Sequence, residues 1–473
     1  MKRFFTLVLA LLLLVTPLLS CGDGCGEGDG GTTPQATEPP VQPPQVPDPI
    51  VDNNNYRAEA EALFAAISVS LESDFDYDFD ASGKARILSY KGEATSVRIP
   101  ETVGIGLPVR SIADGAFASN TALKALVIPN SVETIGNGIL EGCTAIEAIS
   151  APFFAANATE AQYAGYLFGF ESYRDHTKIP ASLAYVRVSG AAAVLSDCAF
   201  SECQQIRTVL LSEMVKKVGK FAFYDCESLK YVDMDHLTEI GNYAFASCRV
   251  LVRATMSREM VSIGLGAFQG CGALSEMTLP FVGGSKESNA FLGYLFGAST
   301  HEFTAGFLPA YLRRVTVLEG CTSLSDYAFF ECSSLREVKL PATLTTVGVR
   351  AFEKCTALES IVLLDAVRTV RENAFFGCSS LASLQLGNGL QILGANAFYG
   401  CSALKSVTLP ASLGFLPASA FADCKALESI DLGGVTRIGK NAFHNCSALS
   451  TVHAHGEVEM EGGNDRVKEI LEK

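Results

Sequence analysis

Cysteine is the residue type whose spacing in this sequence could carry chemistry. There are fifteen cysteines among 473 residues. Thiols can bind metals, act as nucleophiles or pair as disulfides, and an exported chain normally pairs them. Most of them stand at one fixed offset, three residues after a recurring Phe or Leu. One cysteine per repeat predicts a column of small buried side chains whose weak S–H donors meet turn carbonyls. We therefore expect these thiols to be reduced and inert. The column comprises Cys143, Cys203, Cys226, Cys248, Cys271, Cys332, Cys355, Cys378, Cys401, Cys424 and Cys446, and Cys198 lies outside its register.

Two short patterns resemble phosphate-binding and zinc-binding motifs. Residues 434–441 match a phosphate-binding loop except for the final Ser or Thr that would contact Mg²⁺. Similar letters recur in the same register at residues 238–241, so the match is a product of the repeat. His453 and His455 alternate on the last predicted strand near Cys446, but two histidines at the end of a repeat array are more typical of a surface than of zinc ligands. We find no catalytic constellation, and the sequence predicts no enzyme, no cofactor and no metal site.

Alternating aspartates near the N-terminus raise the question of a calcium site. The segment has no glycine-turned loop and no distal bidentate Glu, which calcium loops use. A period of two with aromatic residues in between predicts a strand with one solvated face. The residues are Asp74, Asp76, Asp78 and Asp80, alternating with Phe75, Tyr77 and Phe79.

Composition argues for one motif copied many times. Hydrophobic residues make up 48% of the chain and charged residues 18%, with 29 Phe and no Trp. The formal net charge is −15 and the pI is about 5.0. Because no cluster of Lys and Arg is present, nucleic acid is not a predicted partner.

A repeat of 22 or 23 residues governs the chain from about residue 86. Each unit has an Ala-Phe pair, an aliphatic residue five positions before the Phe, and a Leu or Ile six positions after it. A unit of this size cannot bury its own apolar face and must stack on its copies. In one unit we expect Leu404, Val407 and Leu409 to point inward and Pro410 to end the strand. Glycines such as Gly264 are expected where φ is positive or a neighbouring coil passes close. The repeated Phe positions are Phe117, Phe200, Phe223, Phe245, Phe268, Phe329, Phe352, Phe375, Phe398, Phe421 and Phe443, with Leu140 in a degenerate copy.

The repeat I-G-x-x-A-F-x-x-C-x-x-L-x-x-[VI]-x-[LI]-P resembles the BspA-type, or Treponema-type, leucine-rich repeat of bacterial surface proteins. The resemblance covers residues 86–455 and implies a repeat solenoid of about 23 residues per coil, with short parallel strands on one face and short helices or turns on the other. It also implies a surface adhesin that binds host extracellular matrix or other bacteria. It supplies no binding residues, because the motif consists of core positions.

Two longer units, near residues 152–194 and 280–323, interrupt the rhythm and resemble one another. A block of about 128 residues has therefore been duplicated. Insertions in solenoids often carry binding. Leu-Phe pairs in both units are expected to fill irregular coils, which leaves Tyr166 and Tyr294 as the candidate ligand contacts.

The two ends of the chain differ from the repeats. Lys2 and Arg3 precede an apolar run too short to span a bilayer, which predicts a signal peptide. The sequence Leu-Leu-Ser before Cys21 resembles a bacterial lipobox, which implies a lipid anchor at that thiol. A signal peptide with another cleavage site is the alternative. The predicted parts are a lipoprotein signal peptide at 1–20, a disordered Gly/Pro-rich tether at 21–55, a helix and capping strand at 56–85, the solenoid at 86–455 and a capping helix at 456–473. Leu63, Ile67 and Leu71, at i, i+4 and i+8, predict one amphipathic helix over 56–71. Asn464 is expected to cap the C-terminal helix.

We therefore expect a monomeric, lipid-anchored protein of the bacterial cell envelope, exposed at the surface and binding a protein ligand. The membrane is contacted through the anchor alone. The alternatives are a glycan-binding envelope module, with Tyr166 and Tyr294 stacking on sugar rings, and a passive envelope scaffold. Outward strand positions carry mixed charge and do not identify a ligand; they include Lys230, Tyr231, Asp233, Arg336, Glu337, Lys339, Lys405 and Glu428.

Overall fold

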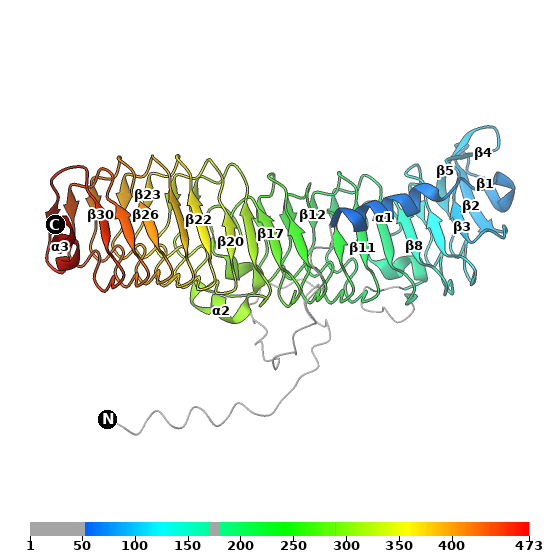
Figure 1. The fold of residues 1–473 in the computed structure, drawn as a ribbon. Coiled ribbons are helices and arrows are strands. Elements are labelled where there is room, and N and C mark those ends of the chain that lie inside the picture. The colour runs from blue at the N-terminus through cyan, green and yellow to red at the C-terminus, as the bar shows by residue number, and fades with distance from the viewer. Residues whose placement is uncertain (1–52, 171, 173–178, 289, 473) are drawn as a thin grey trace, which may run out of the picture. The chain divides into compact units, whose positions relative to one another are not determined.

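The computed structural model describes residues 53–170, 172, 179–288 and 290–472. The predicted signal peptide, Cys21 and nearly all of the predicted tether lie outside these residues. The described chain forms stacked coils that follow one another in sequence order (Figure 1). The predicted leucine-rich repeat solenoid, with parallel strands and coils of about 23 residues, is confirmed.

Each regular coil contributes one strand to a main sheet and one two-residue strand to a second layer, which we call the narrow sheet. The main strands pair in parallel within three sheets, which we call the first, second and third main sheets. Their strand orders are β13-β11-β9-β8-β6-β3, β15-β17-β18-β20-β22-β24 and β26-β28-β30, respectively. Their bounds are β3 Ser96–Arg98, β6 Ala125–Val127, β8 Ala148–Ala151, β9 Tyr185–Val188, β11 Thr208–Leu211, β13 Tyr231–Val232, β15 Arg253–Thr255, β17 Glu276–Leu279, β18 Arg314–Val317, β20 Glu337–Lys339, β22 Ser360–Leu363, β24 Ser383–Leu386, β26 Ser406–Thr408, β28 Ser429–Asp431 and β30 Thr451–His453.

The narrow sheet holds the aliphatic residue that precedes each Phe by five positions. Its strands are β5 Leu107–Ile112, β7 Thr134–Ile135, β10 Val194–Leu195, β12 Lys217–Val218, β14 Glu239–Ile240, β16 Ser262–Ile263, β19 Ser323–Leu324, β21 Thr346–Val347, β23 Thr369–Val370, β25 Ile392–Leu393, β27 Phe415–Leu416, β29 Arg437–Ile438 and β31 Glu459–Met460. Strands β1 (Phe75–Phe79) and β4 (Thr102–Val103) pair antiparallel with β2 (Ala85–Tyr90) and β5 at the N-terminal end. The Ala-Phe segments form turns rather than helices. In the described chain, short helices lie in the two longer units and at the N-terminal end, where η1 (Glu72–Asp74) precedes β1.

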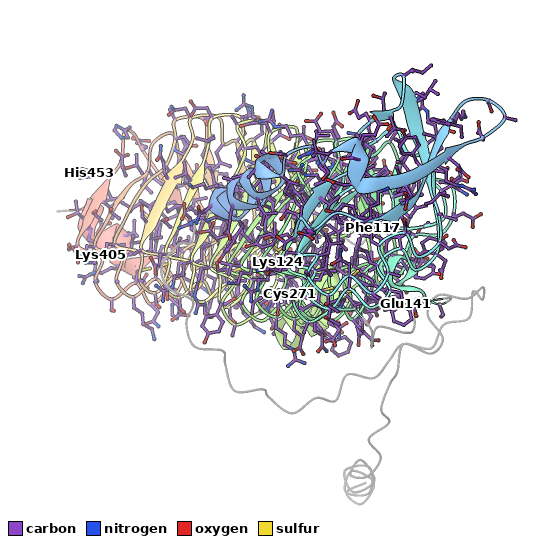
Figure 2. All side chains as sticks on the ribbon, turned by 90° about the vertical axis from the view of Figure 1, so that its right-hand side faces the viewer. Phe117, Lys124, Glu141, Cys271, Lys405 and His453 are labelled. Atoms are coloured by element: carbon purple, nitrogen blue, oxygen red, sulfur yellow. The ribbon has the colours of Figure 1, made fainter. Side chains whose placement is uncertain are left out.

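The repeated Phe rings form a stacked spine inside the coils. Rings of Phe329, Phe352, Phe375, Phe398 and Phe421 follow one another at centroid distances of 4.9, 4.8, 5.1 and 5.2 Å, within 13° of parallel. They are fully buried. The spacing between strands of about 4.8 Å sets the distance between the rings. Backbone hydrogen bonds fix each level, as where Phe352 donates to Ala374 O at 2.7 Å. Figure 2, seen from the end that carries β1 and β2, shows the side chains around the coils.

The expected column of buried thiols is confirmed within the described residues. Typical column members donate from Sγ to the Phe carbonyl of the preceding coil, as Cys226 does to Phe200 O at 3.0 Å. Burial raises the pKa of Cys203 and of Cys271 to about 12, so both remain protonated. Cys321 is a second thiol outside the register; it is buried and free, whereas Cys198 is disulfide-bonded.

The turns place left-handed residues at two positions of the coil, which the sequence analysis did not predict. These positions lie two residues before and two residues after the Phe, as at Asn373 with φ 54° and Gly377 with φ 72° around Phe375. The recurring glycines serve a different purpose. At Gly264 φ is not positive, and a Cβ would lie 2.3 Å from Asn242 N of the preceding coil. Close approach is therefore the reason for glycine at this position.

The first helix differs from the expected one in extent and in its buried face. We predicted a helix over 56–71 with Leu63, Ile67 and Leu71 on one face; α1 spans Asn53–Ala66. Leu71 follows the helix and is 70% exposed, so its place on the face was wrong. The residues that α1 and its C-terminal end bury most completely are Ala60, Phe64 and Ile67.

At the other end, α3 (Asp465–Leu471) packs against β30. We expected Asn464 to cap this helix, but its side chain makes no cap hydrogen bond. It continues the ladder of the last coil instead. Its amide Nδ2 donates to Gly439 O at 2.9 Å, and its Oδ1 accepts from Phe443 N at 3.3 Å. One side chain thus satisfies backbone groups that a further coil would otherwise bind.

Candidate recognition surface

Helix α1 lies across the outer face of the first main sheet, over β8 and β11 (Figure 1). Its apolar residues form a separate small core with outward side chains of the strands. Those strands are buried on both faces, since every residue of β6 and β8 is buried. This burial on both faces resembles that of covered sheets in α/β proteins. The small core consists of Ala60, Phe64 and Ile67 with Ala125, Val127, Ala148 and Leu210.

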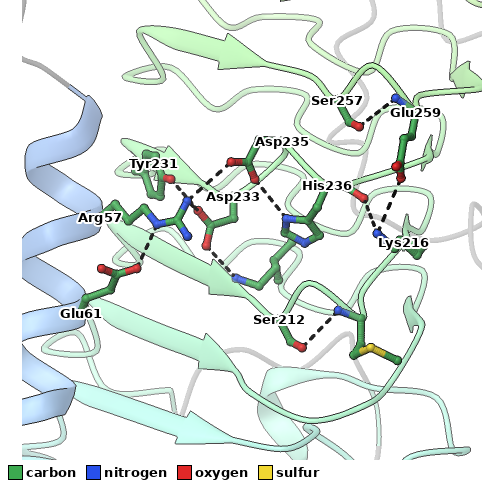
Figure 3. A network of polar contacts seen from close by, with 12 residues as sticks. Arg57, Glu61, Ser212, Lys216, Tyr231, Asp233, Asp235, His236, Ser257 and Glu259 are labelled. Carbon is green, nitrogen blue, oxygen red and sulfur yellow. Dashed lines mark hydrogen bonds and ion pairs between the residues drawn. The ribbon is translucent and has the colours of Figure 1, made fainter.

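Polar contacts hold the first turns of α1 onto the sheet (Figure 3). Arg57 Nη1 lies 3.5 Å from Asp233 Oδ1 and 3.6 Å from Asp235 Oδ2. Tyr231 donates its hydroxyl to Asp233 at 2.5 Å. Glu59 accepts a hydrogen bond of 2.5 Å from the hydroxyl of Tyr185. That bond and partial burial raise the pKa of Tyr185 to about 12.

Further contacts hold the C-terminal end of the helix. Arg98 donates to Ile67 O at 2.7 Å and to Phe64 O at 2.5 Å, which satisfies carbonyls left open at the helix end. The guanidinium of Arg187 lies 4.5 Å from the centre of the Phe64 ring. Burial lowers the pKa of Arg187.

Two of the predicted outward positions are therefore not available to a ligand. Tyr231 and Asp233 do point outward, but α1 covers them, and Asp233 is only 4% exposed. Burial raises the pKa of Asp233, with the Tyr231 hydrogen bond and the Arg57 charge acting in the opposite direction. Their outward placement on the strand is as expected, but the cover that α1 supplies was not predicted.

The second main sheet, β15 to β24, carries charged side chains on its outer face. Arg253, Glu276, Arg314 and Glu337 are register neighbours on β15, β17, β18 and β20. Arg253 Nε lies 2.8 Å from Glu276 Oε2, and Arg314 bridges Glu276 and Glu337, with 2.8 Å to the latter. We call these four residues the ionic ladder. Opposite charges on neighbouring strands stabilise the pairing by a few tenths to about 1 kcal/mol each.

A row of hydroxyl groups runs beside the ionic ladder. Thr255, Thr278 and Thr316 are register neighbours, followed by Lys339. From β15 to β24 the face extends about 24 Å at 4.8 Å per strand. This face offers donors, acceptors and both signs of charge.

The two longer units place their Leu-Phe pairs in the core, as expected. Leu167, Phe168, Leu295 and Phe296 are at most 2% exposed. Each pair lies in a short 3-10 helix, η2 (Ala164–Phe168) or η3 (Leu292–Phe296). The second unit adds η4 (His301–Phe303) and α2 (Thr304–Phe307).

Tyr166 and Tyr294 are both partly buried and pack against the main core. Tyr166 donates its hydroxyl to Ile135 O at 2.9 Å, and partial burial raises its pKa. Its hydroxyl is thus engaged within the protein. A ligand contact by either tyrosine stays a prediction.

The remaining motif candidates make contacts within the coils. Residues 434–441 contain β29 and the turn that follows it. His455 Nε2 lies 2.8 Å from Asp431 Oδ1, while Cys446 is buried and directs Sγ to Phe421 O at 3.1 Å. Among the described residues, no group of three or more His, Cys, Asp or Glu side chains could hold a metal ion.

The N-terminal aspartates bind cations of the chain and turn N–H groups. Asp78 pairs with Arg86 at 2.5 Å and Asp76 with Lys91 at 2.7 Å. Asp80 accepts from Ser82 N and from a second turn N–H.

Of the helices that the structure describes, none has the length and apolarity that crossing a bilayer requires.

Stacked coils, two parallel sheets and an aromatic spine define a leucine-rich repeat solenoid. A family model described as the BspA type leucine rich repeat region matches residues 88–189, 178–294, 306–392 and 348–462. These segments cover well over half of the chain, and the chain belongs to this family.

Solved structures match this chain at low identity. A leucine-rich cell surface protein from Faecalibacterium prausnitzii is 22% identical, with 85% of this chain and 97% of that chain covered and a TM-score of 0.32. A leucine-rich repeat protein from Bacteroides ovatus is 23% identical, with 80% and 92% covered and a TM-score of 0.33. The leucine-rich repeat protein of T. pallidum is 21% identical, with 62% and 91% covered and a TM-score of 0.21. No curated protein matches the chain.

Proposed function

We propose that this protein binds another protein at the bacterial cell surface through the open outer face of β15 to β24. One observation carries the proposal. The outer face is covered by α1 over the first main sheet, whereas the ionic ladder of the second main sheet stays partly exposed, with 41% of the Arg314 side chain and 39% of Glu337 accessible. A face of fixed, alternating charges suits a partner of complementary pattern and gives specificity rather than raw affinity.

A charge swap tests this surface with little risk to folding. Exchanging all four charges together (Arg253→Glu, Glu276→Arg, Arg314→Glu and Glu337→Arg) preserves the three internal pairs but inverts the pattern that a partner meets. The matched control exchanges Arg437→Glu and Glu461→Arg, an ion pair at 2.8 Å beside the narrow sheet. Binding of the full chain to purified extracellular-matrix proteins and to bacterial cells is measured at low and physiological salt.

We expect the ladder swap to weaken binding at least tenfold and the control swap to leave it unchanged. Binding should also fall as salt rises, because exposed charges are screened. Equal binding by both swapped proteins would assign recognition to another face. Absence of binding to every protein and cell would favour a passive scaffold and remove recognition as the function.

The proposal includes a lipid anchor at Cys21 and display on the outside of the cell. Acyl chains on this thiol would hold the acidic body at a membrane by burying about 0.8 kcal/mol per CH₂ group. The cell-surface description of the Faecalibacterium protein is consistent with this placement. In the test, native protein and a Cys21→Ala variant are compared for incorporation of labelled fatty acid and for cleavage by protease on intact cells.

We expect native protein to carry label and to be shaved from cells, and the variant to appear unlabelled in the medium. Label-free native protein would exclude the anchor. Protection from protease until the envelope is breached would exclude outward display.

A further inference from the structure

A pocket of about 460 Å³ opens between the second longer unit and the short strands β19 and β21. This volume falls in the range of small-ligand sites. One wall comes from Phe291 and His301 of the longer unit. The opposite wall comes from the regular coils, with Ser323, Thr346 and Arg371 from three successive levels. The pocket lies beside β19 and β21 of the narrow sheet, whereas the ionic ladder lies on the second main sheet. Occupation of the pocket would therefore not involve the ionic ladder.

The duplicated unit shows why the pocket is open here. Gln162-Tyr163 of the first unit corresponds to Ala290-Phe291 of the second, at the same distance before the Gly-Tyr-Leu-Phe sequence. Gln162 is 2% exposed, and its Nε2 donates to Val194 O at 3.1 Å. In the second unit Ala290 lines the pocket instead. The space that glutamine fills in one copy is left free by alanine in the other.

Aromatic rings form one side of the pocket in fixed positions. The His301 ring stacks on Tyr327 at 3.8 Å and 24°. Phe291 meets His301 edge to face at 6.5 Å and 82°. These rings come from different elements, and packing between them fixes their orientation.

Polar groups of both signs complete the lining. Asp326 Oδ1 accepts from Val349 N at 2.7 Å and from Arg371 Nη1 at 3.3 Å. The aspartate thus holds the arginine over the pocket. Glu287 is exposed at the rim, and Ser323 and Thr346 add hydroxyl groups. Only Arg371 carries a permanent positive charge in the lining, against two carboxylates.

We propose that this pocket binds a neutral sugar unit of a glycan. A sugar ring has an apolar C–H face that suits an aromatic wall and a rim of hydroxyls that both donate and accept. Arginine supplies donors only and carboxylates accept, while serine and threonine do both. Two carboxylates beside one arginine disfavour a phosphate or sulfate ligand. This inference is independent of the proposed protein recognition.

The test uses the full chain and methyl glycosides of glucose, galactose, mannose, N-acetylglucosamine and N-acetylgalactosamine. Saturation-transfer NMR detects binding, and titration gives Kd. Ala290→Gln fills the pocket with the side chain that the first unit accommodates, and Arg371→Ala removes the main donor. Arg336→Ala, directly before β20, is the control, and thermal unfolding checks that each variant is folded.

We expect at least one glycoside to bind the native protein, with Kd raised at least tenfold by Ala290→Gln and by Arg371→Ala but unchanged by Arg336→Ala. The proposal is overturned if none of the five glycosides receives saturation, or if transfer persists undiminished in folded Ala290→Gln. Short peptides that bind and are lost on Ala290→Gln, with no glycoside bound, would assign the pocket to a protein ligand and overturn it as well.

Discussion

Truncating one ring of the aromatic spine should unfold the protein locally, and the Phe352→Ala variant shows this most sharply. Phe352 is fully buried and stacks on Phe329 at 4.9 Å and on Phe375 at 4.8 Å. Replacing a buried Phe by Ala costs about 3–5 kcal/mol through lost transfer energy and the cavity left behind. Loss of two stacked pairs, each about 0.5–1.5 kcal/mol, places Phe352 at the upper end.

Two further truncations calibrate the value. Phe443 has a stacked neighbour on one side alone among the described residues, Phe421 at 6.0 Å, so Phe443→Ala should cost about 1 kcal/mol less. Phe415 is 44% exposed beside Arg437, and Phe415→Ala should cost about 1 kcal/mol or less.

The measurement is hydrogen exchange resolved by peptide, because coils of a solenoid interact mainly with their neighbours and need not unfold together. A loss of about 4 kcal/mol corresponds to exchange about a thousandfold faster in the coils around residue 352. Exchange at the N-terminal strands should change much less. If Phe352→Ala accelerates exchange no more than Phe415→Ala does, the stacked spine is not the source of coil stability and this reasoning is wrong.

Three other predictions address the thiols, the glycines and α1. Burial raises the pKa of Cys271 from 9.0 to about 12. Each such thiol contributes its full stabilisation below pH 9, and the free energy of unfolding falls by about 1.4 kcal/mol per pH unit between pH 9 and the folded-state pKa. Urea unfolding at pH 8 and pH 10.5 should show this loss, and an unchanged midpoint would contradict it. Gly264→Ala should lower the melting temperature by several degrees because its Cβ meets backbone at 2.3 Å, whereas Gly272→Ala, with open space around it, should be neutral or slightly stabilising; equal shifts would refute the close approach. Arg57→Ala should leave buried Asp233 without its cation and raise exchange in α1 at least tenfold, and unaltered protection of α1 would show that the apolar contacts alone hold it.

The repeat made most of the fold predictable from the sequence. Leu404, Val407 and Leu409 are buried as expected. Because stacking fixes the length of each coil, the same face of every main strand points into the core. The thiol column followed from the same constancy of position. A pattern that recurs in every coil reports the environment that every coil shares.

Features that depend on a single coil or on backbone conformation were missed. The left-handed position before each Phe holds residues as unlike as Phe221, Arg350 and Asn373, so side-chain type does not mark it. Asn464 was read as a helix cap from local spacing, but its partners, Gly439 and Phe443, lie in the last coil. Contacts across coils decided both cases.

The position of α1 left a signal in the strands that the sequence analysis did not use. Outward positions on β6, β8 and β11 hold Ala125, Val127, Ala148 and Leu210, all buried beneath the helix. On β22, by contrast, residues alternate between exposed and buried. A strand that is apolar on both faces needs a cover on both faces, and the helix supplies it only as far as β13. The open outer face of this solenoid therefore begins where its outward strand positions become exposed, which is the boundary that a search for ligand-contacting residues should use.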